Sequence, residues 1–189
     1  MGKARRIHGA LAVNPQQPDA MMLVNAYASG VFPMASGHGG RIEWYDPDPR
    51  GVLPLDRFRV PDTLARLVRQ ARFEIRVDVA TLEVMAACAG PRSADNRSWM
   101  SGRLLHAYRE LHACGLVHSV EAWRSGALVG GLYGVALGAA FFGESMFVRP
   151  DLGGSNSSKV CLVHLVRRLR ERGYLLLDTQ MVTAHMRRF

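Results

Sequence analysis

The strongest constraint on the fold is the order of elements in the second half of the chain: three strands, an amphipathic helix and a further strand. The strands are predicted by alternating segments with short turns between them, at residues 118–123, 128–136 and 139–147. The helix presents apolar residues at the spacing of one face: Leu162, Leu165, Val166 and Leu169. Residues 174–179 are apolar on both faces, as in a covered strand. This order predicts an α/β sandwich with a mixed sheet.

The first 60 residues differ in character, since they hold six of the nine prolines and a cluster of glycines. They predict a loop-rich N-terminal domain, 1–60, with one helix at about 19–29 that ends at Gly30. A larger domain, 61–189, follows. Within it, Asp78 is expected to cap the N-terminus of the helix after it.

Composition is that of a globular protein, with 48% apolar and 21% charged residues among 189. Apolar runs are too short to cross a membrane, and no secretory signal is visible. Three widely spaced cysteines fit reduced thiols in the cytoplasm. Lys plus Arg exceed Asp plus Glu by 24 to 16, and nearly all the excess is arginine, which favours a polyanionic partner. A biased base composition of the genome would also raise arginine, so charge alone leaves nucleic acid open.

Asp178 and Gln180 stand two residues apart at the carboxyl end of the last predicted strand, where open α/β sheets tend to bind ligands. A carboxylate beside an amide can orient and deprotonate an amine, while the amide donates to a developing oxyanion. Spacing alone leaves open the alternative that both only satisfy loop amides.

Glu144 interrupts an otherwise apolar strand, beside Phe141, Phe142, Met146 and Phe147. Burying a lone carboxylate is costly, so Glu144 must have a partner, which is either structural or functional.

Other common sites have little support. The residues before Lys159 lack the spacing of a dinucleotide fingerprint or a P-loop, and Ser145 is not in a nucleophile elbow. No zinc-type His or Cys spacing is visible. We therefore expect no metal and no cofactor.

Several segments together resemble the leucyl/phenylalanyl-tRNA–protein transferases, in the order of that family from about residue 20 onward: Gly30-Val-Phe-Pro, Trp44-Tyr-Asp-Pro-Asp-Pro-Arg-Gly-Val-Leu, His118-Ser-Val-Glu-Ala-Trp, Leu128-Val-Gly-Gly-Leu-Tyr-Gly-Val, Phe142-Gly-Glu-Ser-Met-Phe, Ser158-Lys159 and Leu177-Asp-Thr-Gln. The resemblance implies an acetyltransferase-like (GNAT) mixed-sheet C-terminal domain behind a smaller N-terminal one. It also implies transfer of Leu or Phe from aminoacyl-tRNA to the N-terminal Arg or Lys of proteins, which marks them for degradation in the bacterial cytoplasm. We expect the protein to act as a monomer.

The resemblance also implies roles for three candidate catalytic residues. Asp178 would hold the acceptor amine, Gln180 would assist at the carbonyl, and Glu144 would orient Gln180. The reaction is aminolysis of an activated ester, which needs positioning and oxyanion stabilisation more than a covalent nucleophile.

Substrate contacts follow from the same resemblance. Leu132, Phe141 and Met146 would form the apolar pocket for the Leu or Phe side chain, and Trp99 would lie near the adenosine end of the tRNA. From the arginine surplus, we expect Arg66 and Arg69 to contact tRNA phosphates, ahead of Arg167 and Arg168.

The chain departs from the family at its end, because the family usually continues past Phe189 with a segment that completes the sheet. We expect its absence to leave an open sheet edge and to weaken the site. Two alternatives also stay open: an acyl-CoA-dependent N-acetyltransferase, and a catalytically degenerate RNA-binding relative.

Overall fold

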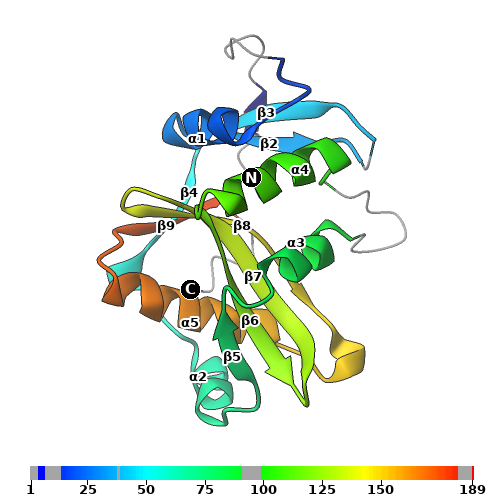
Figure 1. Cartoon of the computed structure of the whole chain (residues 1–189). Helices are drawn as coiled ribbons and strands as arrows, with labels where there is room; N and C mark the ends of the chain where they lie inside the picture. Colours follow the sequence, from blue (N-terminus) through cyan, green and yellow to red (C-terminus); the bar gives the residue numbers. More distant parts are fainter. Residues whose placement is uncertain (1–3, 7–13, 38, 91–98, 183–188) are drawn as a thin grey trace.

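The computed structural model describes residues 4–6, 14–37, 39–90, 99–182 and 189. Two sheets organise these residues, a small one and a large one (Figure 1). The small sheet is antiparallel, in the order β1 (Ala4–Arg6), β3 (Ile42–Pro47) and β2 (Phe32–Ala35). Helix α1 (Ala20–Ala28) packs beside it, and its N-terminus is capped by Asp19, whose side chain accepts a hydrogen bond from the Met22 amide.

The large sheet has six strands, in this spatial order: β4 (Gly51–Pro54), β9 (Leu176–Gln180), β8 (Ala140–Val148), β7 (Ala127–Leu137), β6 (Val117–Arg124) and β5 (Glu74–Val77). Its neighbouring strands are antiparallel except for β8 and β9, which are parallel. The mixed α/β sheet with a smaller N-terminal part is therefore confirmed.

Helices cover both faces of the large sheet: α2 (Asp62–Arg69), α3 (Thr81–Ala89), α4 (Gly102–Ala113) and α5 (Ser157–Glu171). One apolar core lies between the sheet and α5, and the other lies among α1, α3, α4 and the opposite face. Gly130 permits the close approach of α5, because a Cβ atom there would lie 1.9 Å from Ser157 Oγ. Among the described helices, none is long and apolar enough to span a bilayer.

One local expectation is wrong. Asp78 does not cap α3; its carboxylate accepts hydrogen bonds from the Ser119 amide and pairs with His118. The amides of Val79 and Ala80 donate instead to the buried carboxylate of Glu121, at 3.0 and 2.7 Å. Glu121 therefore fixes the two residues before α3, and among the described residues no side chain caps the helix itself.

The last described strand, β9, lies inside the sheet, with β4 and β8 on its two sides. The segment expected to be loop-rich supplies β4, as well as β2 and β3. The division at residue 60 stays a prediction. Because β4 belongs to the large sheet, we propose that the two domains divide between β3 and β4.

Candidate active site

Asp178 lies near the end of β9, where Arg50 holds its carboxylate. Arg50 Nε lies 2.9 Å from Asp178 Oδ2 and 3.1 Å from Oδ1, and the two side chains are 19% and 8% exposed. Arg50 immediately precedes β4, which pairs with β9, so the strand ladder brings the guanidinium to the carboxylate. The result is an ion pair largely shielded from water.

Gln180, the last residue of β9, connects Asp178 to Glu144. Its backbone amide donates to Asp178 Oδ1 at 2.6 Å, and its Nε2 donates to Glu144 Oε1 at 2.9 Å. Its φ is 62°, in the left-handed region that residues other than glycine rarely adopt. Asp178 therefore fixes the backbone from which the Gln180 side chain reaches Glu144.

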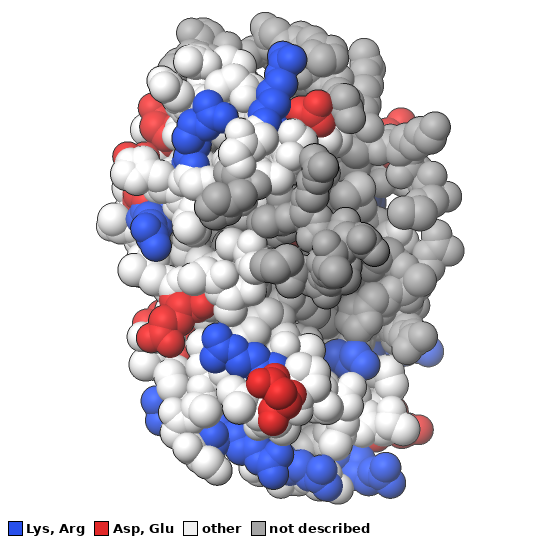
Figure 2. Space-filling view, turned by 90° about the vertical axis from the view of Figure 1, so that its right-hand side faces the viewer, with Lys and Arg blue, Asp and Glu red and all other residues white. Residues whose placement is uncertain are grey.

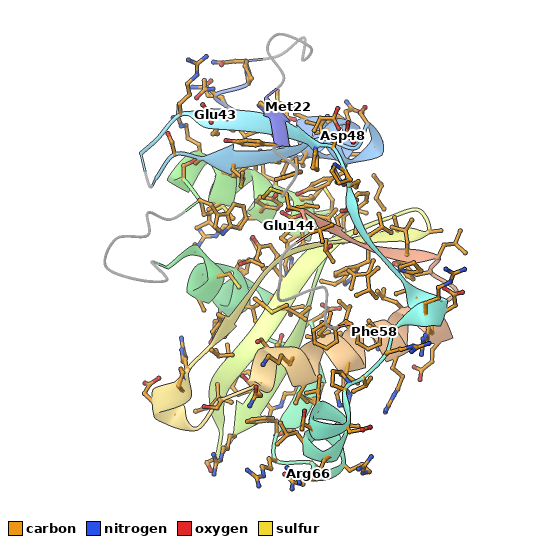
Figure 3. The ribbon with its side chains drawn as sticks, turned by 180° about the vertical axis from the view of Figure 1, so that it is seen from behind. Met22, Glu43, Asp48, Phe58, Arg66 and Glu144 are labelled. Atoms are coloured by element: carbon orange, nitrogen blue, oxygen red, sulfur yellow. The ribbon has the colours of Figure 1, made fainter. Side chains whose placement is uncertain are left out.

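Glu144 lies at a β-bulge in β8. Gly143 is opposite Gly134 and Ser145 is opposite Tyr133, so the intervening Glu144 has no partner in the ladder. Such bulges redirect side chains. The structure thus brings Asp178, Gln180 and Glu144 together at the junction of the two sheets, where Figure 3 shows Glu144 close to the small sheet.

Two buried tyrosines extend this chain of hydrogen bonds. Tyr108 of α4 donates to Glu144 Oε2 at 3.0 Å, and the Tyr27 hydroxyl of α1 lies 2.5 Å from that of Tyr108. Loss of solvent raises the pKa of Glu144 to about 7, although hydrogen bonds from the tyrosines and Gln180 act in the opposite direction. Burial and the Glu144 charge raise the pKa of both tyrosines, which therefore stay neutral donors.

Trp99 is attached to the same network through Tyr108. The two rings meet edge to face with centroids 6.4 Å apart, and the Trp99 carbonyl accepts a hydrogen bond from the Ala35 amide of β2. Trp99 is partly buried, and Tyr108 connects it to Glu144.

The three predicted pocket residues lie on the α5 side of the sheet, whereas the tyrosines lie on the other side. Leu132 and Phe141 are only 3% and 2% exposed, within the core against α5. Met146 is opposite Leu132 across the strand pair and is only partly buried. Of the three, Met146 therefore offers the most accessible surface.

Arg66 and Arg69 are exposed on α2, at the end of the molecule away from Glu144 (Figure 3). In Figure 2, Lys and Arg side chains gather over this same end. The structure therefore does not bring these arginines to the candidate residues Asp178, Gln180 and Glu144.

Sequence reasoning did not single out Arg50, Tyr27 or Tyr108 as site residues. Arg50 lies inside the segment that begins at Trp44 and was part of the family resemblance, so its motif was visible but its contact with Asp178 was not. Tyr108 lies at the apolar spacing of a helix face, and this spacing alone predicts a core position. Within the described ranges, no group of three or more His, Cys, Asp and Glu side chains could hold a metal ion.

A buried carboxylate beside a side-chain amide, at the end of a parallel strand pair, can bind an amine and stabilise an oxyanion, which are two needs of acyl transfer. The sequence places the chain further, because the family model for leucyl/phenylalanyl-tRNA protein transferase matches residues 52–189. A second model, for the N-terminal domain of these proteins, matches residues 17–48. The chain belongs to the leucyl/phenylalanyl-tRNA–protein transferase family of aminoacyltransferases.

Curated relatives support this assignment. The leucyl/phenylalanyl-tRNA–protein transferase of Paramagnetospirillum magneticum is 54% identical over 172 residues, which cover 90% of this chain and 80% of that protein. The protein of the same name from Salinibacter ruber is 51% identical over 168 residues, covering 89% and 71% of the two chains.

Two solved structures are more distantly similar. One is the C-terminal domain of a putative lysylphosphatidylglycerol synthetase from Agrobacterium fabrum, with a TM-score of 0.44 and 14% identity, covering 88% of this chain and 53% of that one. The other is L-PGS from Bacillus licheniformis, with a TM-score of 0.45 and 10% identity, covering 84% and 50%. The chain thus spans about half the length of each.

Proposed function

We propose that this protein transfers Leu or Phe from aminoacyl-tRNA to the N-terminal Arg or Lys of acceptor proteins and so marks them for degradation. It would act as a monomer in the bacterial cytoplasm. The observation that carries the proposal is the hydrogen-bonded set of Asp178, Gln180 and Glu144, in a chain that belongs to this family.

The reaction forms an amide bond and breaks an ester bond. The acceptor amine attacks the ester carbonyl carbon and loses a proton, and the ribose hydroxyl leaves and gains one. Asp178 can bind the incoming amine, because a carboxylate has about four acceptor positions and Arg50 and Gln180 use only some of them. Oδ2, which accepts only from Arg50 among the described residues, is the oxygen we assign to the amine.

Gln180 has a second Nε2 hydrogen beyond the one that it donates to Glu144. We assign this hydrogen to the oxyanion that develops on the ester carbonyl, where a fixed donor favours the transition state over the substrate. Glu144, held in turn by Tyr108, keeps the amide in place.

The donor side chain would enter between β8 and β9. These strands pair only over Ala140–Phe142 and Leu176–Asp178, and β8 then continues to Val148 without β9 beside it. From the point where the pairing of β8 and β9 ends, the donor side chain would extend toward Met146 on the α5 side of the sheet. We therefore assign Met146 to the pocket, with Leu132 and Phe141 behind it.

Replacing Met146 with Ala is expected to shift donor preference without abolishing transfer. Shortening one pocket side chain changes discrimination between similar apolar donors by ~1–3 kcal/mol, so the ratio of kcat/KM for Leu-tRNA to that for Phe-tRNA should move. Met21→Ala, at a methionine that is 65% exposed on α1, is the control. An unchanged ratio in Met146→Ala would place Met146 in the core alone.

The tRNA body would lie along the end of the molecule that carries α2. Replacing both Arg66 and Arg69 with Ala is expected to weaken the salt dependence of tRNA binding. The slope of log Kd against log salt concentration should fall by ~1–2, because each lost phosphate contact lowers that slope by about 0.7–0.9. KM for aminoacyl-tRNA should rise while kcat stays near its original value, since both arginines lie far from Glu144 (Figure 3).

The comparison for this salt measurement is the pair Arg167 and Arg168 on α5, where Arg167 is exposed and Arg168 partly buried. Kd for each double variant is measured at several salt concentrations. A slope equal to the parent's in both variants would show that neither helix contacts the tRNA backbone.

The function itself is tested with Phe-tRNA or Leu-tRNA carrying a labelled amino acid and a peptide that begins with Lys or Arg. We expect label on the peptide N-terminus, and none on a matched N-acetylated peptide. Transfer from acetyl-CoA instead would indicate an N-acetyltransferase. Binding of charged tRNA with no product from either donor would indicate a degenerate RNA-binding protein.

A further inference from the structure

Arg50 makes contacts with both parts of the molecule. Its Nε holds both carboxylate oxygens of Asp178, in the large sheet. Its Nη1 donates to the carbonyl of Gly30, which follows α1, and its guanidinium lies 5.5 Å from the centre of the Phe32 ring in β2. One side chain therefore joins the catalytic carboxylate to the small N-terminal part.

Several contacts fix the orientation of the Arg50 guanidinium. A largely buried arginine keeps its orientation when its donors are anchored and a ring covers its face. Nη2 is also buried, with no hydrogen-bond partner among the described residues. Leaving a buried donor unpaired costs free energy, so packing alone does not account for an arginine at this position.

A series of contacts connects Arg50 to Glu144. It orients the carboxylate of Asp178, whose Oδ1 fixes the amide of Gln180 in its left-handed conformation. From that backbone, Gln180 Nε2 reaches Glu144. We propose that Arg50 is a positioning residue for the transfer reaction, which acts through Asp178 and aligns it with Gln180.

This proposal rests on the proposed function, since it assigns Arg50 to the same reaction. It predicts that Arg50 matters only while Asp178 is present. Arg50→Gln should lower kcat for transfer by about tenfold and leave KM for aminoacyl-tRNA within about twofold. In an Asp178→Asn background, the same substitution should change kcat by less than about twofold.

Arg149→Gln is the matched control. Arg149 also lies over a phenylalanine ring, at 5.6 Å from the centre of Phe147, and its Nη1 also donates to a backbone carbonyl, that of Leu128, at 3.0 Å. It makes no contact with Asp178 among the described residues, so its replacement should leave kcat near that of the parent. Arg50→Lys keeps the charge without the planar fork and should give an intermediate kcat.

Thermal unfolding of the same four proteins (parent, Arg50→Gln, Asp178→Asn and the double variant) gives a readout that needs no activity. The losses in Tm of the two single variants should not add in the double variant, because both remove the same pair. If Arg50→Gln fails to fold, Arg50→Lys replaces it in both measurements.

An equal fall in kcat from Arg50→Gln with and without Asp178 would overturn the proposal, and so would additive losses in Tm. So would an equal fall in Arg149→Gln. A parent protein that transfers no amino acid, but shows the non-additive Tm losses, would refute the proposed function and leave the pairing of Arg50 with Asp178 supported.

Discussion

Replacing Asp178 with Asn is expected to lower kcat by ~10²–10⁴-fold while the protein stays folded. Asn has nearly the same shape as Asp, but it lacks the charge that would bind and deprotonate the acceptor amine. It also cannot accept hydrogen bonds from Arg50 Nε at both terminal atoms, as Asp178 does. The alignment of Gln180 is then weakened together with the charge.

The measurement is a single-turnover rate with saturating charged tRNA and a Lys-initiated peptide, alongside a thermal unfolding curve. Asp151→Asn, at an exposed carboxylate before α5, serves as the control and should leave the rate unchanged. A near-parental rate for Asp178→Asn would remove Asp178 from the chemistry.

Replacing Glu144 with Gln is expected to lower kcat by ~10²-fold, the scale of a displaced reacting group. A carboxylate accepts hydrogen bonds from both Gln180 Nε2 and Tyr108, whereas an amide offers one acceptor and one donor. Either Gln180 Nε2 or the Tyr108 hydroxyl would then face the NH2 group of the new amide, which is a donor, in place of an acceptor oxygen. Gln180 would be held less firmly at the ester carbonyl.

The titration of Glu144 is expected to make kcat depend on pH. Because burial raises the pKa of Glu144 to about 7, this carboxyl is protonated below that pH and ionised above it. Hydrogen bonds to the ionised form are stronger, so we expect kcat to rise as the pH increases through about 7. In Glu144→Gln this step should be missing, because an amide does not titrate. A step of the same height in the variant would assign the titration to another group.

Periodicity predicted the elements of the second half well, because the strands and the helix there carry their apolar residues in well-defined local patterns. The three strands of the meander, α5 and β9 all appear within a few residues of their predicted positions. Prolines and glycines in the first part masked its short strands, some of which pair with segments far away in the sequence. Strand β4 is the clearest case, since its partner β9 lies more than 120 residues later.

The sequence predicted only part of the candidate site, because several of its contacts join residues that are far apart in the sequence. Asp178 and Gln180 are close in sequence, so their proximity could be predicted. Arg50 reaches Asp178 across 128 residues, and Tyr108 reaches Glu144 across 36. The Asp78 expectation failed in the same way, because Glu121, more than 40 residues away, takes the amides at the start of α3.

The position of β4 limits how the protein can be divided into fragments. Removing residues 1–60 would uncover the whole hydrogen-bonding edge of β9, the strand that carries Asp178, and would remove Arg50 as well. An uncovered strand edge invites pairing with other chains. A fragment that begins after residue 60 would therefore aggregate through the strand that carries Asp178, whereas one that begins before Arg50 would keep that strand enclosed.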